Sequence, residues 1–87
     1  MKPNVIAINE KDNVAIALEN IGEGKIVHLP DGSEFRALEH IPFSHKVALS
    51  DIHQGRDIIK YGEVIGQAGE DIKRGGWVHS HNLVIED

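Results

Sequence analysis

The sequence predicts an all-β domain with little or no helix, and three observations support this fold class. Short runs of Val, Ile and Ala alternate with Gly, Pro, Asn and Asp, the residues that favour turns. No stretch keeps an apolar spacing of about 3.6 residues over the roughly 10 to 12 residues that a helix needs. A motif typical of a sharp corner also recurs along the chain.

The first half of the chain predicts two hairpins. The polar link Glu10-Lys11-Asp12 is typical of a hairpin turn between two runs rich in Val, Ile and Ala. In the second hairpin, Pro30 presets φ and Gly32 tolerates positive φ, so the chain should reverse there. The four expected strands are residues 4–9, 13–18, 25–29 and 34–38.

The second half predicts four or five further strands. Pro42 cannot donate a hydrogen bond to a strand ladder, so we expect an irregular crossing before the first of them. The last two runs also suit one bent strand. The expected strands are residues 46–49, 57–60, 63–68, 77–79 and 81–85.

The corner motif is Ala-x-x-(Asn/Asp)-Ile-x-x-Gly, and it occurs in residues 17–24, 48–55 and 68–75. We expect a strand to end in each copy, the Asn or Asp side chain to bond its own backbone, the Ile to point inward and the Gly to take positive φ. Such corners indicate a strongly bent domain, and by themselves they suit a small barrel equally well.

Size and charge limit the classes of partner. The 87 residues suit one domain spanning residues 1–87. A core this small leaves little apolar area for a private cleft, so size alone favours a partner chain and leaves a homo-oligomer open. The net charge is −5 and the nine Lys and Arg residues are scattered, which argues against nucleic acid. A small anion remains open, because a few local cations are enough to bind it.

The absence of cysteine excludes disulfides and thiolate metal sites and favours a reducing compartment. The first apolar run has only four residues before Asn9, far short of a secretory segment or of the roughly 20 residues that span a membrane. We therefore expect a soluble, cytoplasmic protein with no membrane partner.

His79 and His81 are the first candidate site residues. If residues 77–83 are extended, both side chains lie on one side of the strand. Two imidazoles on one face can bind a metal ion, with a carboxylate such as Glu63 as the third ligand. Alternatively, both rings belong to an ordinary strand face, where backbone carbonyls satisfy them.

Other candidates lie next to predicted strands. Lys46, beside His45, can bind a substrate carboxylate as a point charge, or it is simply solvated. In the turn Lys60-Tyr61-Gly62-Glu63, the two charges favour a structural ion pair, whereas the Tyr61 phenol can donate to a substrate hydroxyl. We expect Trp77 to fill space as a core or interface anchor, and His40 and His53 to be exposed.

The runs HIPFSHKVAL (40–49) and DIHQGRDIIKYGEVIGQAGEDIKRGGWVHSHNL (51–83) resemble a known family. They are similar to the small SAF-type (β-clip) module of altronate and galactarate dehydratases and to the related small subunit of sulfolactate sulfo-lyase. The resemblance implies a β-clip fold for nearly the whole chain. It also implies that His79-x-His81-Asn82 is a feature of the site and that His45 and Lys46 face a shared active site.

The resemblance further implies a small subunit or N-terminal module of a metal-dependent hydro-lyase that removes water from a polyhydroxy acid. A larger catalytic chain would hold most of the Fe²⁺ or Mn²⁺ site, and the module would be inactive alone. The implied alternatives are a sulfolactate sulfo-lyase subunit and a non-catalytic carbohydrate- or protein-binding module. The expected roles are catalytic for His45, His79 and His81, substrate-binding for Lys46, Lys60 and Tyr61, and metal-binding for His79, His81 and Glu63.

Overall fold

The chain folds into nine short strands, and residues 2–85, which the computed structural model describes, contain no helix. This confirms the predicted all-β class. Every expected strand contains or overlaps an observed one, although most observed strands are shorter. The strands are β1 (Val5–Ile6), β2 (Val14–Ala17), β3 (Ile26–His28), β4 (Glu34–Arg36), β5 (Lys46–Ala48), β6 (Asp57–Lys60), β7 (Glu63–Ala68), β8 (Trp77–Val78) and β9 (Leu83–Val84).

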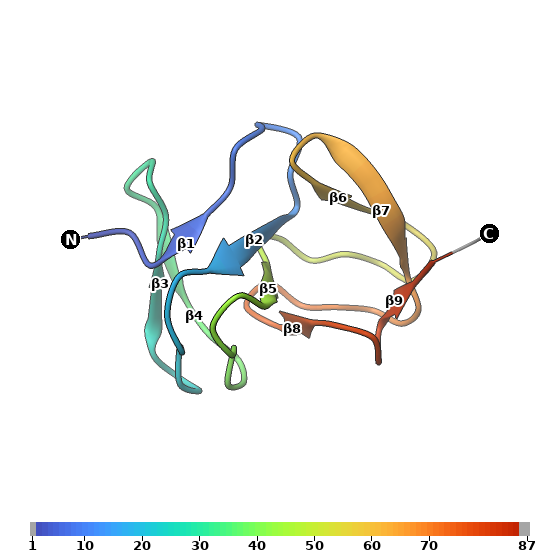
Figure 1. Ribbon diagram of the computed structural model, residues 1–87. Helices are drawn as coiled ribbons and strands as arrows, with labels where there is room; N and C mark the ends of the chain where they lie inside the picture. Colours follow the sequence, from blue (N-terminus) through green and yellow to red (C-terminus); the bar gives the residue numbers. More distant parts are fainter. Residues whose placement is uncertain (1, 86–87) are drawn as a thin grey trace.

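An antiparallel sheet with the order β1-β2-β5-β8 forms the centre of the fold (Figure 1). Val47 on β5 lies opposite Ala15 on β2 and Trp77 on β8. Because successive side chains alternate along a strand, these three residues share one face of the sheet, and Ala48 and Val78 share the other. Each face packs against a different set of strands.

Two hydrophobic cores lie on the two faces of this sheet. One face packs against the β3–β4 hairpin through Val27 and Phe35, and the other against the β6-β7-β9 sheet through Ile58 and Ala68 (Figure 1). The first core contains Val5, Ala15, Ala17, Ile21, Val27, Ala37, Ile41 and Val47. The second contains Val14, Ala48, Ile52, Ile58, Ala68, Ile72 and Val78.

The corner motif occurs four times rather than three. Gly24, Gly55 and Gly75 have φ of 80°, 86° and 92°, which confirms the positive φ expected at each copy. Residues 37–44 form the fourth corner, in which Ser44 takes the glycine position with φ of 71°. The sequence hides this copy because His40 and Ser44 replace the Asn or Asp and the Gly of the motif.

The corners pair through their isoleucines, which are buried as predicted. Isolated antiparallel bridges join Ile21 to Ile41 and Ile52 to Ile72. The prediction that the motif's Asn or Asp bonds its own backbone is wrong. These side chains instead accept hydrogen bonds from the facing corner, as Asn20 Oδ1 does from the backbone N–H of Phe43.

The first hairpin has shorter strands than expected, because side chains take over the hydrogen bonds near its turn. Asp12 Oδ2 accepts hydrogen bonds from the backbone N–H groups of Ile8 and Asn9. Asn13 is drawn towards β6, where its Oδ1 accepts a 2.7 Å hydrogen bond from Ile59 N–H. This loop is therefore attached to the β6–β7 hairpin as well as to its own strands.

The end of the chain is not a single bent strand. β8 pairs with β5 in the central sheet, whereas β9 pairs with β7 in the other sheet. Between them the chain turns, with the His79 carbonyl accepting hydrogen bonds from Asn82 N–H and Leu83 N–H. The turn between β8 and β9 thereby links the two sheets.

Candidate functional site

His45 and His79 face each other where β5 begins and β8 ends. The β5–β8 register pairs Lys46 with Val78, and continuing it by one residue sets His45 opposite His79. Opposed residues of antiparallel strands have Cβ atoms about 4.5–5.5 Å apart. The two ring centres are 4.6 Å apart, with the ring planes tilted by 39°. The strand register thus brings two of the predicted catalytic histidines into contact.

Trp77 contacts all three predicted catalytic histidines. Its indole stacks on the His79 ring at 5.4 Å between centres, with only 8° between the planes, and lies 5.0 Å from the His81 ring. The indole Nε1–H donates a 3.1 Å hydrogen bond to His45 Nδ1. We call His45, Trp77, His79 and His81 the histidine–tryptophan cluster.

Trp77 does pack against the first hydrophobic core, in keeping with the space-filling role predicted for it. That prediction missed its polar contacts. Its backbone N–H donates to Glu39 Oε2 at 3.0 Å, and its carbonyl accepts from Asn82 Nδ2 at 2.9 Å. Glu39 was not a candidate, because nothing near it in the sequence indicates that its carboxylate reaches a strand 38 residues further along the chain.

Asn82 shapes the turn that carries His81. It is 4% exposed, and its Oδ1 accepts a 2.9 Å hydrogen bond from the backbone N–H of His79. Residues 80–82 therefore form a turn and not the extended segment that we expected. The turn, rather than strand alternation, returns the His81 ring to Trp77.

The alternative in which backbone carbonyls satisfy the imidazoles is not what the structure shows. His45 and His79 are half-buried and His81 is exposed. Within residues 2–85, His45 Nδ1 bonds the indole, and no hydrogen bond joins the ring nitrogens of His79 or His81 to another protein group. These two rings are therefore available to a ligand at the rim of the domain.

The surroundings of His79 favour its neutral form. Loss of hydration lowers the pKa of His79 below its ordinary value of 6.5, and the positive charges of His45, Lys46 and His81 act in the same direction. A neutral imidazole has one nitrogen free to accept a proton or to bind a metal ion.

Lys46 and Lys60 form a second group, which we call the lysine pair. Lys46 is the first residue of β5 and directly follows His45, so in extended backbone the two side chains point to opposite faces. Partial burial lowers the pKa of Lys46 below its ordinary value, and the positive charge of Lys60 adds to this effect. Within residues 2–85 neither lysine makes a salt bridge with a carboxylate. An anion would relieve their repulsion.

The β6–β7 hairpin places Tyr61 beside Lys60. Tyr61 and Gly62 both have positive φ, at 55° and 80°, as a tight two-residue hairpin turn requires. Asp12 Oδ1 holds this turn by accepting a 2.7 Å hydrogen bond from Gly62 N–H. The Lys60 amine lies 5.0 Å from the centre of the exposed Tyr61 ring.

Glu63 lies opposite Lys60 in the hairpin, but the structure shows the lysine amine over Tyr61 rather than in the expected ion pair. Among the residues that the structure describes, no three His, Asp or Glu side chains are grouped so that they could hold a metal ion. His79, His81 and Glu63 are therefore not brought together as three ligands among these residues.

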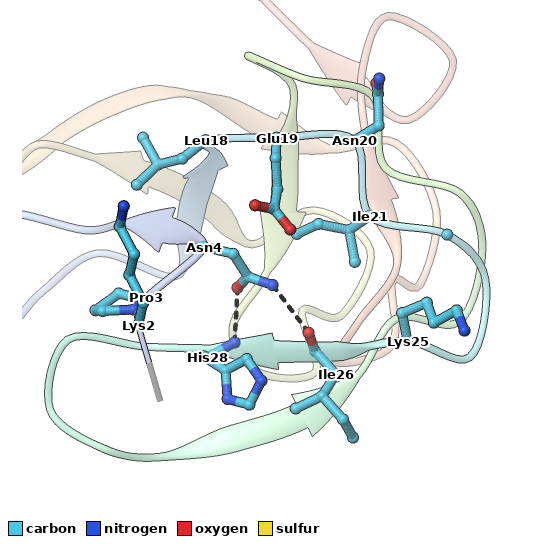
Figure 2. A pocket seen from close by; sticks show the side chains of 11 residues that line it. Lys2, Pro3, Asn4, Leu18, Glu19, Asn20, Ile21, Lys25, Ile26 and His28 are labelled. Atoms are coloured by element: carbon cyan, nitrogen blue, oxygen red, sulfur yellow. Dashed lines mark hydrogen bonds between the residues drawn. The ribbon is translucent and has the colours of Figure 1, made fainter.

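One cavity lies outside these groups. It has a volume of about 720 Å³, and Figure 2 shows its lining, which includes none of the predicted site residues. Its one buried polar side chain is Asn4, which donates to the Ile26 carbonyl and accepts from His28 N–H. The amide of Asn4 is thus satisfied within the fold.

The remaining histidines lie apart from the cluster. His40 and His53 are exposed, as predicted. His28 Nδ1 is 3.1 Å from Glu34 Oε2 across the β3–β4 hairpin.

None of the described residues forms a helix long and apolar enough to cross a membrane.

The fold and the site define a small all-β module in which three imidazoles gather around one indole, with His81 exposed and His45 and His79 half-buried. Comparison with known protein families identifies the family to which this module belongs. Residues 3–86 match the model of the altronate/galactarate dehydratase SAF domain. The chain belongs to this family.

Curated relatives agree with this assignment. Galactarate dehydratase (L-threo-forming) of Escherichia coli K12 is 44% identical over 82 residues, which are 94% of this chain and 15% of that protein. Altronate dehydratase of the same organism is 43% identical over 77 residues, again 15% of its length. The alpha subunit of (2R)-sulfolactate sulfo-lyase from Paracoccus pantotrophus is 48% identical over 54 residues, which are 60% of this chain and 81% of that subunit. The chain thus spans about one seventh of the dehydratases that it matches.

Proposed function

We propose that this chain is the small subunit or N-terminal module of a metal-dependent sugar-acid dehydratase and that it works with a larger catalytic chain in the cytoplasm. The histidine–tryptophan cluster carries the proposal, because it leaves the rings of His79 and His81 open at a rim instead of enclosing them in a pocket. The dehydratase relatives, which are several times longer, also support the need for a further chain.

The reaction class sets the chemical requirements. A hydro-lyase removes a proton next to a carboxylate and expels a hydroxyl group from the neighbouring carbon. Fe²⁺ or Mn²⁺, when bound, would stabilise the negative charge that develops on the substrate. The described residues do not supply a complete set of ligands. We therefore assign the metal mainly to the larger chain, with His79 and His81 as the side chains here that are open to join it.

The residues of this chain meet the other requirements. Where a metal ion does not take its lone pair, the neutral form of His79, which its surroundings favour, can accept a proton. The lysine pair has no carboxylate partner among the described residues and can bind the substrate carboxylate. Tyr61, beside Lys60, can donate its phenol proton to a substrate hydroxyl. These roles require a substrate that contacts both the histidine–tryptophan cluster and the lysine pair. The larger chain would then enclose the substrate from the other side.

The second candidate is the small subunit of a sulfolactate sulfo-lyase. One observation favours it: the match covers 81% of the Paracoccus subunit, so a free-standing chain of about this size has a counterpart in that enzyme. The substrate of such an enzyme carries a sulfonate beside its carboxylate, and the lysine pair suits either anion.

Purification of the tagged chain from its own cells, together with the chains that bind it, tests these proposals. The purified complex is assayed with galactarate, altronate and sulfolactate, with and without Fe²⁺ or Mn²⁺. Metal-dependent loss of water from a sugar acid supports the dehydratase, and release of sulfite from sulfolactate supports the second candidate. Failure to act on all three substrates, or copurification with no larger chain, contradicts both and leaves a non-catalytic binding module.

A further inference from the structure

We propose that Trp77 is a positioning residue that fixes the His45 imidazole in one tautomer, with its proton on Nε2, so that His45 binds an oxygen of the ligand as a hydrogen-bond donor. The identity of that ligand, a polyhydroxy acid, rests on the function proposed above. The tautomer itself follows from this chain alone.

The direction of one hydrogen bond determines the tautomer. The indole nitrogen of Trp77 is only a donor, so His45 Nδ1, 3.1 Å away, must accept and must carry a lone pair. A neutral imidazole has one protonated and one unprotonated nitrogen. The proton of neutral His45 therefore lies on Nε2. The partner of one ring nitrogen sets the state of the other.

The rest of the structure keeps the indole from turning away. The Trp77 backbone is held on both sides, by Glu39 at its N–H and by Asn82 at its carbonyl. The indole packs against the first hydrophobic core and stacks on His79. A donor fixed in this way is part of the folded framework, so the tautomer of His45 is set before any ligand arrives.

This arrangement gives the neighbouring imidazoles of His45 and His79 different hydrogen-bonding roles. His45 presents Nε2–H as a donor, while no hydrogen bond occupies the ring nitrogens of His79 within the described residues, so a neutral His79 has an acceptor nitrogen open beside it. Their ring centres are 4.6 Å apart. A hydroxyl group both accepts and donates, so it can bind the two rings at once. The pair is therefore suited to recognise a substrate hydroxyl, which leaves the carboxylate to the lysine pair.

In this tautomer, neutral His45 cannot act as a metal ligand. Nδ1 is occupied by the indole, and Nε2 carries the proton, so neither nitrogen of the neutral ring offers a lone pair to a metal ion. His45 differs in this respect from His79 and His81, whose ring nitrogens bond no group within the described part of the chain. Of the three predicted catalytic histidines, His45 is thus a hydrogen-bond donor to substrate.

Nitrogen NMR of the isotopically labelled chain tests the tautomer. At a pH about two units above the ordinary imidazole pKa of roughly 6.5, we expect the His45 Nε2 to show the shift of a protonated nitrogen and Nδ1 that of an unprotonated one. Trp77→Phe keeps an aromatic ring beside His79 but removes the N–H, and should move both His45 shifts towards each other as the second tautomer becomes populated. His81→Ala also removes a ring that contacts Trp77, but should leave the His45 shifts unchanged.

A wild-type His45 with its proton on Nδ1, or shifts that Trp77→Phe leaves unchanged, would overturn the proposal. If Trp77→Phe does not fold, as judged by its amide spectrum, the coupling across the hydrogen bond between Trp77 Nε1 and His45 Nδ1 is measured in the wild type, and its absence overturns the proposal. These readouts need no enzyme activity. A confirmed tautomer in a complex that is inactive on sugar acids would therefore disprove the proposed function alone.

Discussion

Asp51 and Asp71 each stabilise the other's corner. Asp51 Oδ1 accepts a 2.8 Å hydrogen bond from the backbone N–H of Arg74, and Asp71 Oδ1 accepts one of the same length from Gln54 N–H. These reciprocal bonds flank the bridge between Ile52 and Ile72. The two corners therefore form one unit, which carries the chain from β5 to β6 and from β7 to β8.

Asp51→Ala should lower the free energy of unfolding by about 1 kcal/mol, the usual net contribution of one intramolecular hydrogen bond. Asp51→Asn should cost less, because Asn20 makes the equivalent bond in the other pair of corners. Urea unfolding of the two variants measures this difference. Equal losses for Ala and Asn would show that the side-chain acceptor contributes nothing to the corner.

Ser44→Gly should raise the free energy of unfolding by about 0.5–1 kcal/mol, because Ser44 has φ of 71° and glycine takes this conformation without strain. Ser50→Gly is the control, since Ser50 is exposed and has no positive φ. That change should be neutral or mildly destabilising. Thermal unfolding compares the two, and a Ser44→Gly variant less stable than wild type contradicts the expectation.

Gly75→Ala and Gly24→Ala separate backbone strain from close packing. Both glycines have positive φ, so alanine costs about 1 kcal/mol at either position. A Cβ at Gly75 would also lie 2.5 Å from the Arg36 carbonyl oxygen, whereas a Cβ at Gly24 would meet nothing within 4 Å. We expect Gly75→Ala to cost at least about 1 kcal/mol more. Similar losses in urea unfolding would argue against the close approach of Gly75 to β4.

The pKa of His79 should lie below 6.5 and should rise in Lys46→Gln, because that variant removes one of the positive charges that lower it. Lys73→Gln, which changes an exposed lysine outside this group of charges, should leave it unchanged. NMR titration of the ring protons measures all three proteins. An unchanged pKa in Lys46→Gln would place Lys46 too far from His79 to act on a shared ligand.

The lowered pKa of His79 also fixes the sign of its effect on stability. Above the ordinary pKa of 6.5, His79 is neutral in the folded and in the unfolded chain, and its contribution is fully present. As the pH falls from 6.5 through the folded pKa, the unfolded chain binds the proton first, and stability is lost. His79→Gln should therefore flatten the fall in unfolding free energy over this range, as urea unfolding at a series of pH values can show.

Much of the fold could be predicted, because strands and hairpin turns depend on neighbouring residues. The Val- and Ile-rich runs located the strands, and the glycines of the corner motif took the expected φ. What could not be predicted depends on distant residues. The partners of Asp51 and Asp71 lie in the facing corner, and the disguised copy ending at Ser44 is recognisable only by its pairing with residues 17–24.

Three of the predicted site residues, His45, His79 and His81, lie together around Trp77, but the sequence did not indicate how they are arranged. His45 and His79 meet because of the β5–β8 register, which no local pattern shows. Lys46 leaves the opposite face of β5 from His45, so the expected joint His45-Lys46 surface is two groups instead of one. Asn82 bends the segment that the His79-x-His81 pattern suggested was extended. The strand-like alternation of residues 77–83 could not indicate that the buried Asn82 amide would form this turn.

The central claim is that the histidine–tryptophan cluster completes an active site with a larger chain. The most direct test is the sugar-acid dehydratase activity of the purified complex containing His79→Ala, compared with the complex containing His53→Ala, which changes an exposed histidine outside the cluster. The claim predicts that His79→Ala lowers kcat by roughly 10²-fold or more, as loss of an acid–base group does, while His53→Ala matches wild type. Full activity of the His79→Ala complex would contradict it.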